Sequence, residues 1–423
     1  MSRIVVTTIG SLGDLHPKIA IALELRARGH DIVFATHKGY QPKLEALGFE
    51  FHEMRPDGTD DPLEIARMTD RKTGSEYVVR NWLLPNLRDT YTDLMSVAKA
   101  ADFMIAGEIV YAARLVAETL GMRWATSALS PFSLFSAYDP SVIAFLPFLA
   151  RFRGLGMPLN RGIIQLLKAV TQSWTEPIHQ LRAELGLPRR SENPIIDDKF
   201  SPYLVLALFS SVLAKPQPDW AENTIITGFT FYDGNRNQPE LTPELQQFLE
   251  AGEPPLVFTL GSAAVGNAGS FYPESIQAVT QLNRRAVLLV GENTPLDSLS
   301  KDIFVTNYVP YSQIFPRACA IVHQGGIGTT AQALRAGRPT LIMPYTYDQP
   351  DNAARVQRIG TSRTIPREQY SASRVAKELR ELLENPSYAA KAAEAGRIVQ
   401  AENDVGAACD AIERQLREVV ISS

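Results

Sequence analysis

Residues 321–352 have the sequence IVHQGGIGTTAQALRAGRPTLIMPYTYDQPDN. An apolar strand leads into a glycine-rich turn, and a helix, a second strand and a polar tip with Asp348 and Gln349 follow. This order places bare backbone N–H groups at a helix N-terminus, where the helix dipole favours an anion such as a pyrophosphate. The acid and the amide then arrive at the C-terminal end of the next strand, where α/β sheets place ligand-binding groups.

The glycine-rich turn differs from the phosphate loop of nucleotide triphosphatases. It has no GK[ST] ending, which argues against a Walker loop with its lysine and Mg²⁺. His323 stands where the strand meets the turn, in a position to donate a hydrogen bond to a phosphate oxygen. The sequence therefore predicts a diphosphate site held by backbone groups and a histidine.

The pattern H-x-G-G-x-G-T…G-x-P…P…D-Q…N-A resembles the donor-binding signature of family 1 glycosyltransferases. The resemblance implies the GT-B architecture, which is two facing doubly wound domains with a ligand cleft between them. It also implies that a sugar nucleotide binds here. The diphosphate would contact His323 and the backbone of Gly325, Gly326, Gly328 and Thr329, and the sugar hydroxyls would contact Asp348 and Gln349.

Strands and helices alternate in two successive halves, which predicts an α/β protein with two parallel, doubly wound sheets. We expect an N-terminal acceptor-binding domain at residues 1–231 and a polar linker with Pro and Gly at 232–242. A nucleotide-sugar-binding domain follows at 243–400, and a helix at 401–423 is a candidate for crossing back to the first domain. Residues 131–172 indicate loops and short helices.

Size and charge exclude several classes of protein. The 423 residues are enough for two domains, and a net charge of −4 argues against nucleic acid as a partner. Two cysteines provide neither a disulfide framework nor a metal site. No signal peptide and no run of 18 apolar residues is visible, so we expect a cytoplasmic protein, a monomer or a weak dimer.

The turn after the first strand, IGSLGDLHP at residues 9–17, provides the candidate base. The resembling family has G-H-x-x-P or G-D-x-x-P here with H or D as general base, so the role falls on Asp14, with His16 as the rival. The alternative is that Asp14 only caps a helix. Family members with a histidine base orient it with an aspartate at the position of Gly107, so this departure favours Asp14 and leaves Glu108 as a weaker candidate partner.

Other donor contacts follow from the same resemblance. Gly261 and Ser262 would bind the β-phosphate, and the turn at Tyr308 and Val309 would bind the base, although Tyr308 could equally belong to the core. Plant members carry a glutamate for the ribose hydroxyls at the position of Ala331. Its absence makes a dTDP-sugar plausible beside a UDP-sugar.

The acceptor side is predicted from an aromatic segment. Aromatic side chains at residues 131–172 would either wall a lipophilic pocket or pack under loops. The candidates are Phe132, Phe135, Tyr138, Phe145 and Phe148. The flanking arginines Arg151, Arg153 and Arg161 suit an acidic acceptor group or lipid headgroups, which leaves peripheral contact with the inner membrane face open.

Together these features predict a metal-independent inverting glycosyltransferase with no cofactor, similar in many phrases to the rhamnosyltransferase B chains of rhamnolipid biosynthesis. The donor would be a dTDP- or UDP-sugar, with dTDP-rhamnose as one candidate, and the acceptor a hydroxy fatty acid, polyketide, sterol or phenolic. Backbone amides, the helix dipole, Ser262 and His323 would stabilise the diphosphate in place of Mg²⁺. A nucleotide-sugar 2-epimerase and an auxiliary nucleotide-binding subunit stay open as alternatives.

Overall fold

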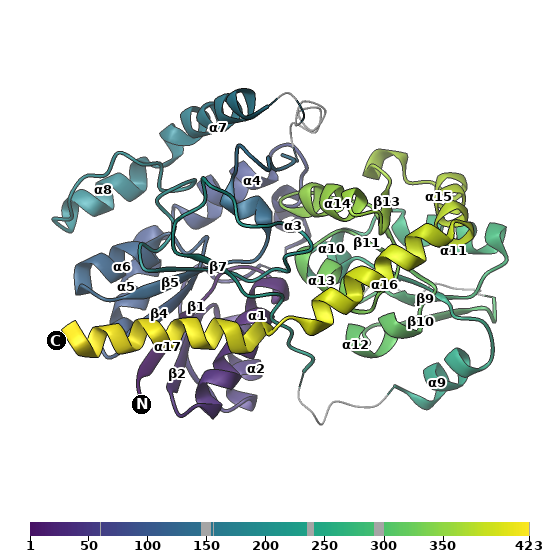
Figure 1. Cartoon of the computed structure of the whole chain (residues 1–423), viewed down its shortest axis with the longest axis horizontal. Helices are drawn as coiled ribbons and strands as arrows, with labels where there is room; N and C mark the ends of the chain where they lie inside the picture. Colours follow the sequence, from purple (N-terminus) through teal and green to yellow (C-terminus); the bar gives the residue numbers. More distant parts are fainter. Residues whose placement is uncertain (60, 145–153, 155, 235–240, 292–299, 423) are drawn as a thin grey trace.

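The computed structural model describes residues 1–59, 61–144, 154, 156–234, 241–291 and 300–422 (Figure 1). The chain forms two lobes, each built on a parallel sheet with helices on both faces. The predicted α/β class and the two facing doubly wound domains of the GT-B architecture are confirmed.

The N-terminal sheet has seven strands in the order β3-β2-β1-β4-β5-β6-β7. The inner strand β1 pairs in parallel with β2 and β4, so that Val5 lies opposite Val33 on one side and Met104 on the other. The strands are β1 (Arg3–Thr7), β2 (Asp31–Thr36), β3 (Glu50–Glu53), β4 (Phe103–Gly107), β5 (Trp124–Ala128), β6 (Leu204–Ala207) and β7 (Thr224–Ile226).

Alternate residues of β1 enter different cores. Ile4 and Val6 pack with Leu15 and Ile19, whereas Val5 packs on the opposite face. Both faces are buried, which is why these strands are continuous apolar runs. The helices of this lobe are α1 (Leu12–Ala27), α2 (Gln41–Ala46), α3 (Pro62–Met68), α4 (Gly74–Tyr77), α5 (Leu87–Ala98), α6 (Ala112–Leu120), α7 (Met157–Thr171) and α8 (Glu176–Glu184), with single turns η1 (Lys38–Tyr40), η2 (Val78–Leu83), η3 (Pro131–Leu134) and η5 (Gln172–Trp174).

The C-terminal sheet has six strands in the order β10-β9-β8-β11-β12-β13. They are β8 (Leu256–Thr259), β9 (Ala286–Leu289), β10 (Ile303–Thr306), β11 (Ala320–His323), β12 (Thr340–Ile342) and β13 (Ser362–Thr364). The helices are α9 (Pro243–Glu250), α10 (Gly261–Ala264), α11 (Phe271–Leu282), α12 (Tyr311–Ile314), α13 (Ile327–Arg335), α14 (Gln349–Arg358), α15 (Ala372–Glu384), α16 (Pro386–Ala401) and α17 (Asp404–Ser422), with single turns η6 (Val265–Asn267), η7 (Phe315–Arg317) and η8 (Arg367–Gln369).

Two elements differ from the sequence expectation. Within 131–172, where short helices were expected, α7 runs over 15 residues. After Pro158 no further proline interrupts the helix, and the apolar residues of LNRGIIQLLKAVT recur at helical spacing. The helix expected at 401–423 begins at Asp404 as α17, because the extended backbone of Glu402 separates it from α16.

The last helix packs on the first lobe. Figure 1 shows α17 running along the first lobe. Its Cys409, Ile412 and Leu416 lie in the same core as Ile4 of β1. At the crossing, Glu402 accepts hydrogen bonds from the Ser210 hydroxyl at 2.8 Å and the Ser211 backbone at 3.1 Å. The domain boundaries stay a prediction, and residues 235–240 of the expected linker lie outside the described residues.

Candidate active site

The candidate site lies where the carboxyl ends of both sheets face each other. The start of α1, after β1, contacts α10, after β8. A shared apolar core holds the lobes together, with Phe209 and Phe229 from the first lobe against Leu334 and Val356 from the second. Groups from the two lobes therefore meet in one cleft.

Asp14 is the third residue of α1 and forms a capping box with Ser11. Its Oδ2 accepts from the Ser11 backbone N–H at 2.8 Å and the hydroxyl at 3.3 Å, and no hydrogen bond within the described part of the chain ends on Oδ1. Gly10 permits this approach, because at φ +125° a Cβ there would lie 2.4 Å from Oδ2. Asp14 thus caps its helix and keeps one oxygen available.

Burial raises the pKa of the Asp14 carboxyl, and nearby Glu108 adds to the rise, while Lys18 and Ser11 oppose it. Asp14 also interacts electrostatically with Asp348 of the opposite lobe. The two acids predicted from separate motifs therefore share one cleft.

His16 points toward α2 rather than toward Asp14. Its Nε2 lies 3.0 Å from the Lys43 ammonium, and its ring is 5.1 Å from that of Tyr232. Burial first, and Lys43 second, lower the pKa of His16 to about 4. The imidazole is therefore neutral, and its lone pair on Nε2 already accepts a hydrogen bond from an ammonium group.

Glu108 follows β4 and is held by two partners. One carboxylate oxygen accepts from the Ser133 hydroxyl, and the other lies 2.8 Å from the Lys199 ammonium. Lys199 in turn lies 5.1 Å above the Phe200 ring and 6.0 Å above the Phe135 ring. Glu108 is thus fixed at the edge of the cleft.

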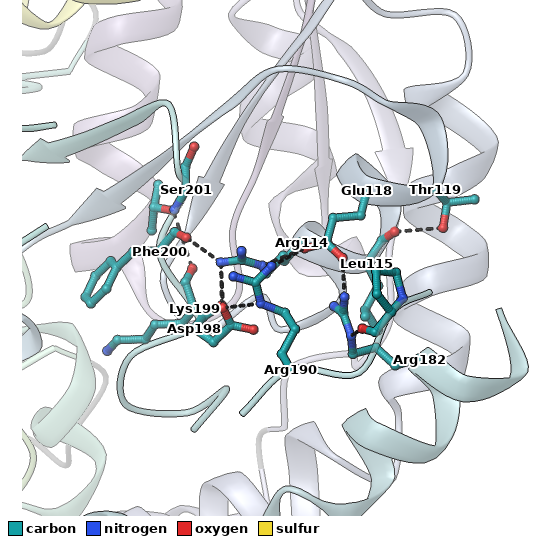
Figure 2. A network of polar contacts seen from close by, with 12 residues as sticks. Arg114, Leu115, Glu118, Thr119, Arg182, Arg190, Asp198, Lys199, Phe200 and Ser201 are labelled. Atoms are coloured by element: carbon teal, nitrogen blue, oxygen red, sulfur yellow. Dashed lines mark hydrogen bonds and ion pairs between the residues drawn. The ribbon is translucent and has the colours of Figure 1, made fainter. Parts of the chain in front are cut away.

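An arginine network on the outer side positions Lys199 (Figure 2). Arg114 of α6 donates to the backbone carbonyls of Asp198 and Phe200, the two residues that flank Lys199, at 3.0 and 2.8 Å. Arg190 donates to the Asp198 carboxylate at 2.8 Å, and Arg182 pairs with Glu118 at 2.5 Å. The network fixes the backbone on both sides of the lysine.

His323 ends β11 and is fully buried. Its Nδ1 accepts a hydrogen bond from the Gly325 backbone at 3.0 Å, so the proton belongs on Nε2. That Nε2 has no partner among the described residues, although buried donors are nearly always paired. Burial lowers the pKa of His323 to about 3, so the ring is a neutral donor.

Neighbouring side chains leave no room for a Cβ at several glycines of the donor site. Gly325 (φ +87°) has no room for a Cβ, which would lie 2.9 Å from the Ile342 side chain. Gly261 (φ +63°) would place a Cβ 2.3 Å from the Gln324 amide nitrogen, and Gly326 would place one 2.9 Å from it. Gly328, next to buried Thr329 in the first turn of α13, would meet nothing within 4 Å.

Asn352 joins the glycine loop to the acid of the polar tip. Its amide nitrogen donates to the Gly325 carbonyl at 3.0 Å and to the Asp348 carboxylate at 2.7 Å. Burial raises the pKa of Asp348 to about 7, with further contributions from Asp14 and Glu108. Gln349 is buried, and its carbonyl oxygen accepts from the Tyr345 backbone at 2.8 Å.

Buried ion pairs connect α14 to the first lobe. Arg355 donates to Asp351 at 2.6 Å on its own helix and to Asp139 in the loop after η3. Asp351 also accepts from the Val142 backbone at 2.8 Å, and Arg358 pairs with Asp139 at 2.8 Å. The helix that begins with Gln349 is thereby tied to the segment predicted to contact the acceptor.

The remaining donor candidates differ in their exposure. Ser262 is exposed in the first turn of α10, and Val309 is buried. Tyr308 is 66% exposed, so it is not a core residue. Tyr311 was not predicted from the sequence. Its hydroxyl lies 2.9 Å from the hydroxyl of Thr259, at the end of β8.

The predicted acceptor aromatics divide into three groups. Phe132 and Phe135 are half-buried with ring centroids 5.4 Å apart, and Phe135 packs against the core of α6 and α8. Tyr138 is exposed. Phe145 and Phe148 lie outside the described residues.

Sequence reasoning missed several residues of the cleft. Asn352 could have been found from its helical i,i+4 spacing to Asp348, which puts both on one face. Tyr347, whose hydroxyl donates to the Met68 carbonyl across the lobes, and the buried Lys18 carry no local sequence signal.

Within the described ranges, no group of three or more His, Cys, Asp and Glu side chains is arranged to hold a metal ion. No helix there combines the length and the apolar character needed to cross a bilayer.

Comparison with known proteins gives matches over both lobes. Residues 4–137 match the glycosyltransferase family 28 N-terminal domain, and residues 274–404 match the C-terminal domain of erythromycin biosynthesis protein CIII-like proteins. Over 425 residues the chain is 31% identical to O-mycaminosyltylonolide 6-deoxyallosyltransferase of Streptomyces fradiae, which covers 97% of each chain.

Two further similarities are more distant. The chain is 27% identical to sterol 3-beta-glucosyltransferase of Neurospora crassa over 98% of its own length, but spans only 27% of that longer protein. The structure of spinosyn rhamnosyltransferase SpnG complexed with thymidine diphosphate shares the fold, with a TM-score of 0.69 and 18% identity over 98% of this chain and 100% of that one.

The raised pKa of Asp348 predicts a pH-dependent stability. The folded state keeps a proton on this carboxyl up to about pH 7, whereas the unfolded chain releases it near the ordinary value of 3.8. Between these values the native state binds more protons, so the free energy of unfolding falls as the pH rises. Asp348→Asn removes this contribution.

We therefore expect Asp348→Asn to gain stability over the wild type from pH 5 to 7. The gain should approach at most about 1.4 kcal/mol per pH unit, and less because water in the cleft screens a partly exposed group. Urea unfolding without nucleotide measures it, with Glu381→Gln at an exposed position of α15 as the control. A difference that stays constant with pH would show that Asp348 does not titrate there.

Proposed function

This chain belongs to the GT-B glycosyltransferases, and from that premise we propose that it is an inverting, metal-independent enzyme that uses Asp14 as its general base. It is an NDP-sugar-dependent glycosyltransferase, and its relatives act on natural products and sterols. The observation that carries the proposal is the buried Nε2–H of His323 in the second lobe, which has no partner among the residues that the structure describes, together with the Oδ1 of Asp14 in the first.

In the proposed reaction, an acceptor hydroxyl oxygen attacks the anomeric carbon of the donor sugar. Its proton passes to Asp14, and the bond between that carbon and the diphosphate oxygen breaks. The nucleoside diphosphate leaves with the electron pair of that bond. Attack comes from the first lobe and departure goes toward the second, so the configuration at the anomeric carbon inverts.

The proposed charge stabilisation uses groups of the second lobe in place of a metal ion. The Nε2–H of His323 and the backbone N–H groups at the start of α13 would donate to the diphosphate oxygens. The low pKa of His323 suits this role, because the ring stays a neutral donor at all working pH values. Asp348 and Gln349 would contact the sugar.

For the donor we propose a dTDP-linked 6-deoxysugar. Ala331 lies in the core between the lobes and offers no polar group to a ribose 2′-hydroxyl. The 6-deoxyallosyl transfer named for the Streptomyces fradiae relative and the thymidine diphosphate in the SpnG structure support the same choice. The rhamnosyl specificity expected from the sequence stays a proposal within this class.

For the acceptor we propose a hydrophobic molecule with a free hydroxyl, of the hydroxy fatty acid, polyketide or sterol type. Phe132 and Phe135 form an aromatic pair in the loop that also carries Asp139. Because Asp139 is tied to α14, this loop and the donor-binding helix have a fixed relative position.

The base assignment predicts the effect of Asp14→Asn. The amide oxygen still accepts the Ser11 N–H, so the helix cap and the fold persist, but the side chain no longer accepts a proton. Transfer at pH 7.5 should fall by about 10²- to 10⁴-fold, with dTDP affinity unchanged, in an assay of product formation. His16→Gln is the comparison, and a larger loss there would assign the base to His16 instead.

The donor assignment predicts nucleotide-dependent stability. In a thermal-shift panel, dTDP should raise the unfolding midpoint by a few degrees and exceed UDP and GDP, because ligand binding stabilises by mass action. His323→Ala should shrink the shift and lower transfer by roughly 10²-fold. A midpoint that no nucleoside diphosphate moves, or full turnover without the imidazole, would contradict the assignment.

The proposal extends to an anionic lipid surface as a partner, with α7 as the contact. Leu159, Leu166 and Val170 are 43%, 60% and 54% exposed and follow one face of the helix at i, i+7 and i+11. Residues 140–175 contain four basic side chains and no acidic one, in a chain of net charge −4. Apolar exposure with positive charge suits a membrane interface.

Serine at Leu159, Leu166 and Val170 together should lower affinity for phosphatidylglycerol vesicles about tenfold or more, because each buried apolar side chain contributes on the order of 1.5 kcal/mol. Cosedimentation measures it, with phosphatidylcholine vesicles as the neutral comparison. Leu63→Ser, at a 70% exposed leucine on α3, is the matched control. Equal binding by the triple variant and the wild type would exclude α7 as the contact.

A further inference from the structure

A buried lysine lies one helical turn after the proposed base. Lys18 of α1 is 1% exposed, and its ammonium donates to the backbone carbonyl of Asp14 at 3.0 Å. A buried ammonium is costly unless opposite charge compensates it. Asp14 and Glu108 are the two carboxylates that interact with it electrostatically.

The end of β4 makes room for this ammonium. A Cβ on Gly107 would lie 3.5 Å from the Lys18 Nζ and 3.4 Å from the buried Thr8 hydroxyl. A longer side chain at position 107 would therefore compete with the lysine for space. The ammonium sits under the carboxyl ends of β1 and β4, the two central strands of the sheet.

The positive charge of Lys18 beside Gly107 fits an aspartate base and not a histidine base. A histidine that becomes cationic on accepting a proton is stabilised by an anionic partner, whereas an aspartate that must start ionised requires a cation. At Gly107 the chain lacks the aspartate that would suit a histidine, and a lysine from α1 fills the adjoining space.

We propose that Lys18 is a positioning residue that keeps Asp14 ionised between turnovers, with Gly107 providing the space for its ammonium. This inference rests on the proposed role of Asp14 as the base. Without Lys18, Asp14 would face two carboxyl groups and two phenols, and like charges favour the protonated form.

The surroundings of Asp14 leave this task to Lys18. Tyr40 of η1 and Glu108 face Asp14 within the first lobe, and Tyr347 and Asp348 face it from the second. None of these four groups carries a positive charge at neutral pH. Burial lowers the pKa of Lys18 to about 8, and the carboxylates oppose that fall, so the ammonium form persists at neutral pH.

The test is the pH profile of kcat for sugar transfer by Lys18→Met between pH 5 and 9. Loss of the positive charge raises the pKa of Asp14, so the acidic limb should move up by at least one pH unit. The rate at pH 6 should fall tenfold or more relative to the wild type and recover to within about threefold at pH 9. A loss by the same factor at every pH indicates a merely structural role and overturns the inference.

Two comparisons complete the test. Lys43→Met removes the ammonium beside His16. If the acidic limb of the pH profile shifts in Lys43→Met and not in Lys18→Met, the base is His16 and the inference is overturned. If Lys18→Met does not fold, Glu108→Gln and the double variant Lys18→Met/Glu108→Gln give the same comparison with one carboxylate fewer near the vacated position. If the acidic limbs of Glu108→Gln and the double variant coincide, the inference is overturned as well.

The outcomes separate this inference from the proposed function. If Asp14→Asn keeps full activity, Asp14 is not the base and the proposed function fails. If Asp14→Asn is inactive and the acidic limb of Lys18→Met is not shifted, Asp14 is still the base and only the role of Lys18 is ruled out. Binding of dTDP, measured by calorimetry, should be unchanged in Lys18→Met, because Lys18 lies on α1 of the first lobe and the proposed diphosphate contacts belong to the second.

Discussion

The fixed contact between the two lobes is the constraint on which the site depends. The base candidate and the diphosphate donors belong to different sheets, so neither lobe contains a complete site. Arg355, with Asp351 on its own helix and Asp139 on the other lobe, buries charge at this boundary. Such pairs are costly to break, because one partner is then left uncompensated. They therefore specify how the lobes meet.

Burial favours the neutral form of the histidine and of the acids in the cleft, and this has opposite consequences for their roles. His323 loses its ability to become charged and is left as a directed donor, whereas Asp14 and Asp348 are pushed toward their protonated forms. An acid that is easily protonated is useful as a base only while something keeps it ionised. The protein solves this within one helix, since Lys18 follows Asp14 by a single turn.

Much of the fold could be predicted because its signals are local. Apolar runs and glycine turns specify parallel strands, and the motif around His323 specifies its own loop, since the Gly325 N–H bonds back to the imidazole. Long-range partners could not be foreseen. Nothing near Lys18 announces that it lies beside Gly107, and Asp139 meets Arg355 across more than two hundred residues. The length of α7 was missed because its exposed apolar face imitates a buried segment.

The position of α17 has a consequence for how the protein is made. Its side chains complete the core around β1, so the lobe that leaves the ribosome first is finished by a helix that is synthesised after the second lobe. During translation, the surface of α1 that later receives Cys409 and Ile412 stays open to water. Removal of α17 would therefore open the core of the lobe that the chain forms first, although the deleted residues follow the second lobe in the sequence.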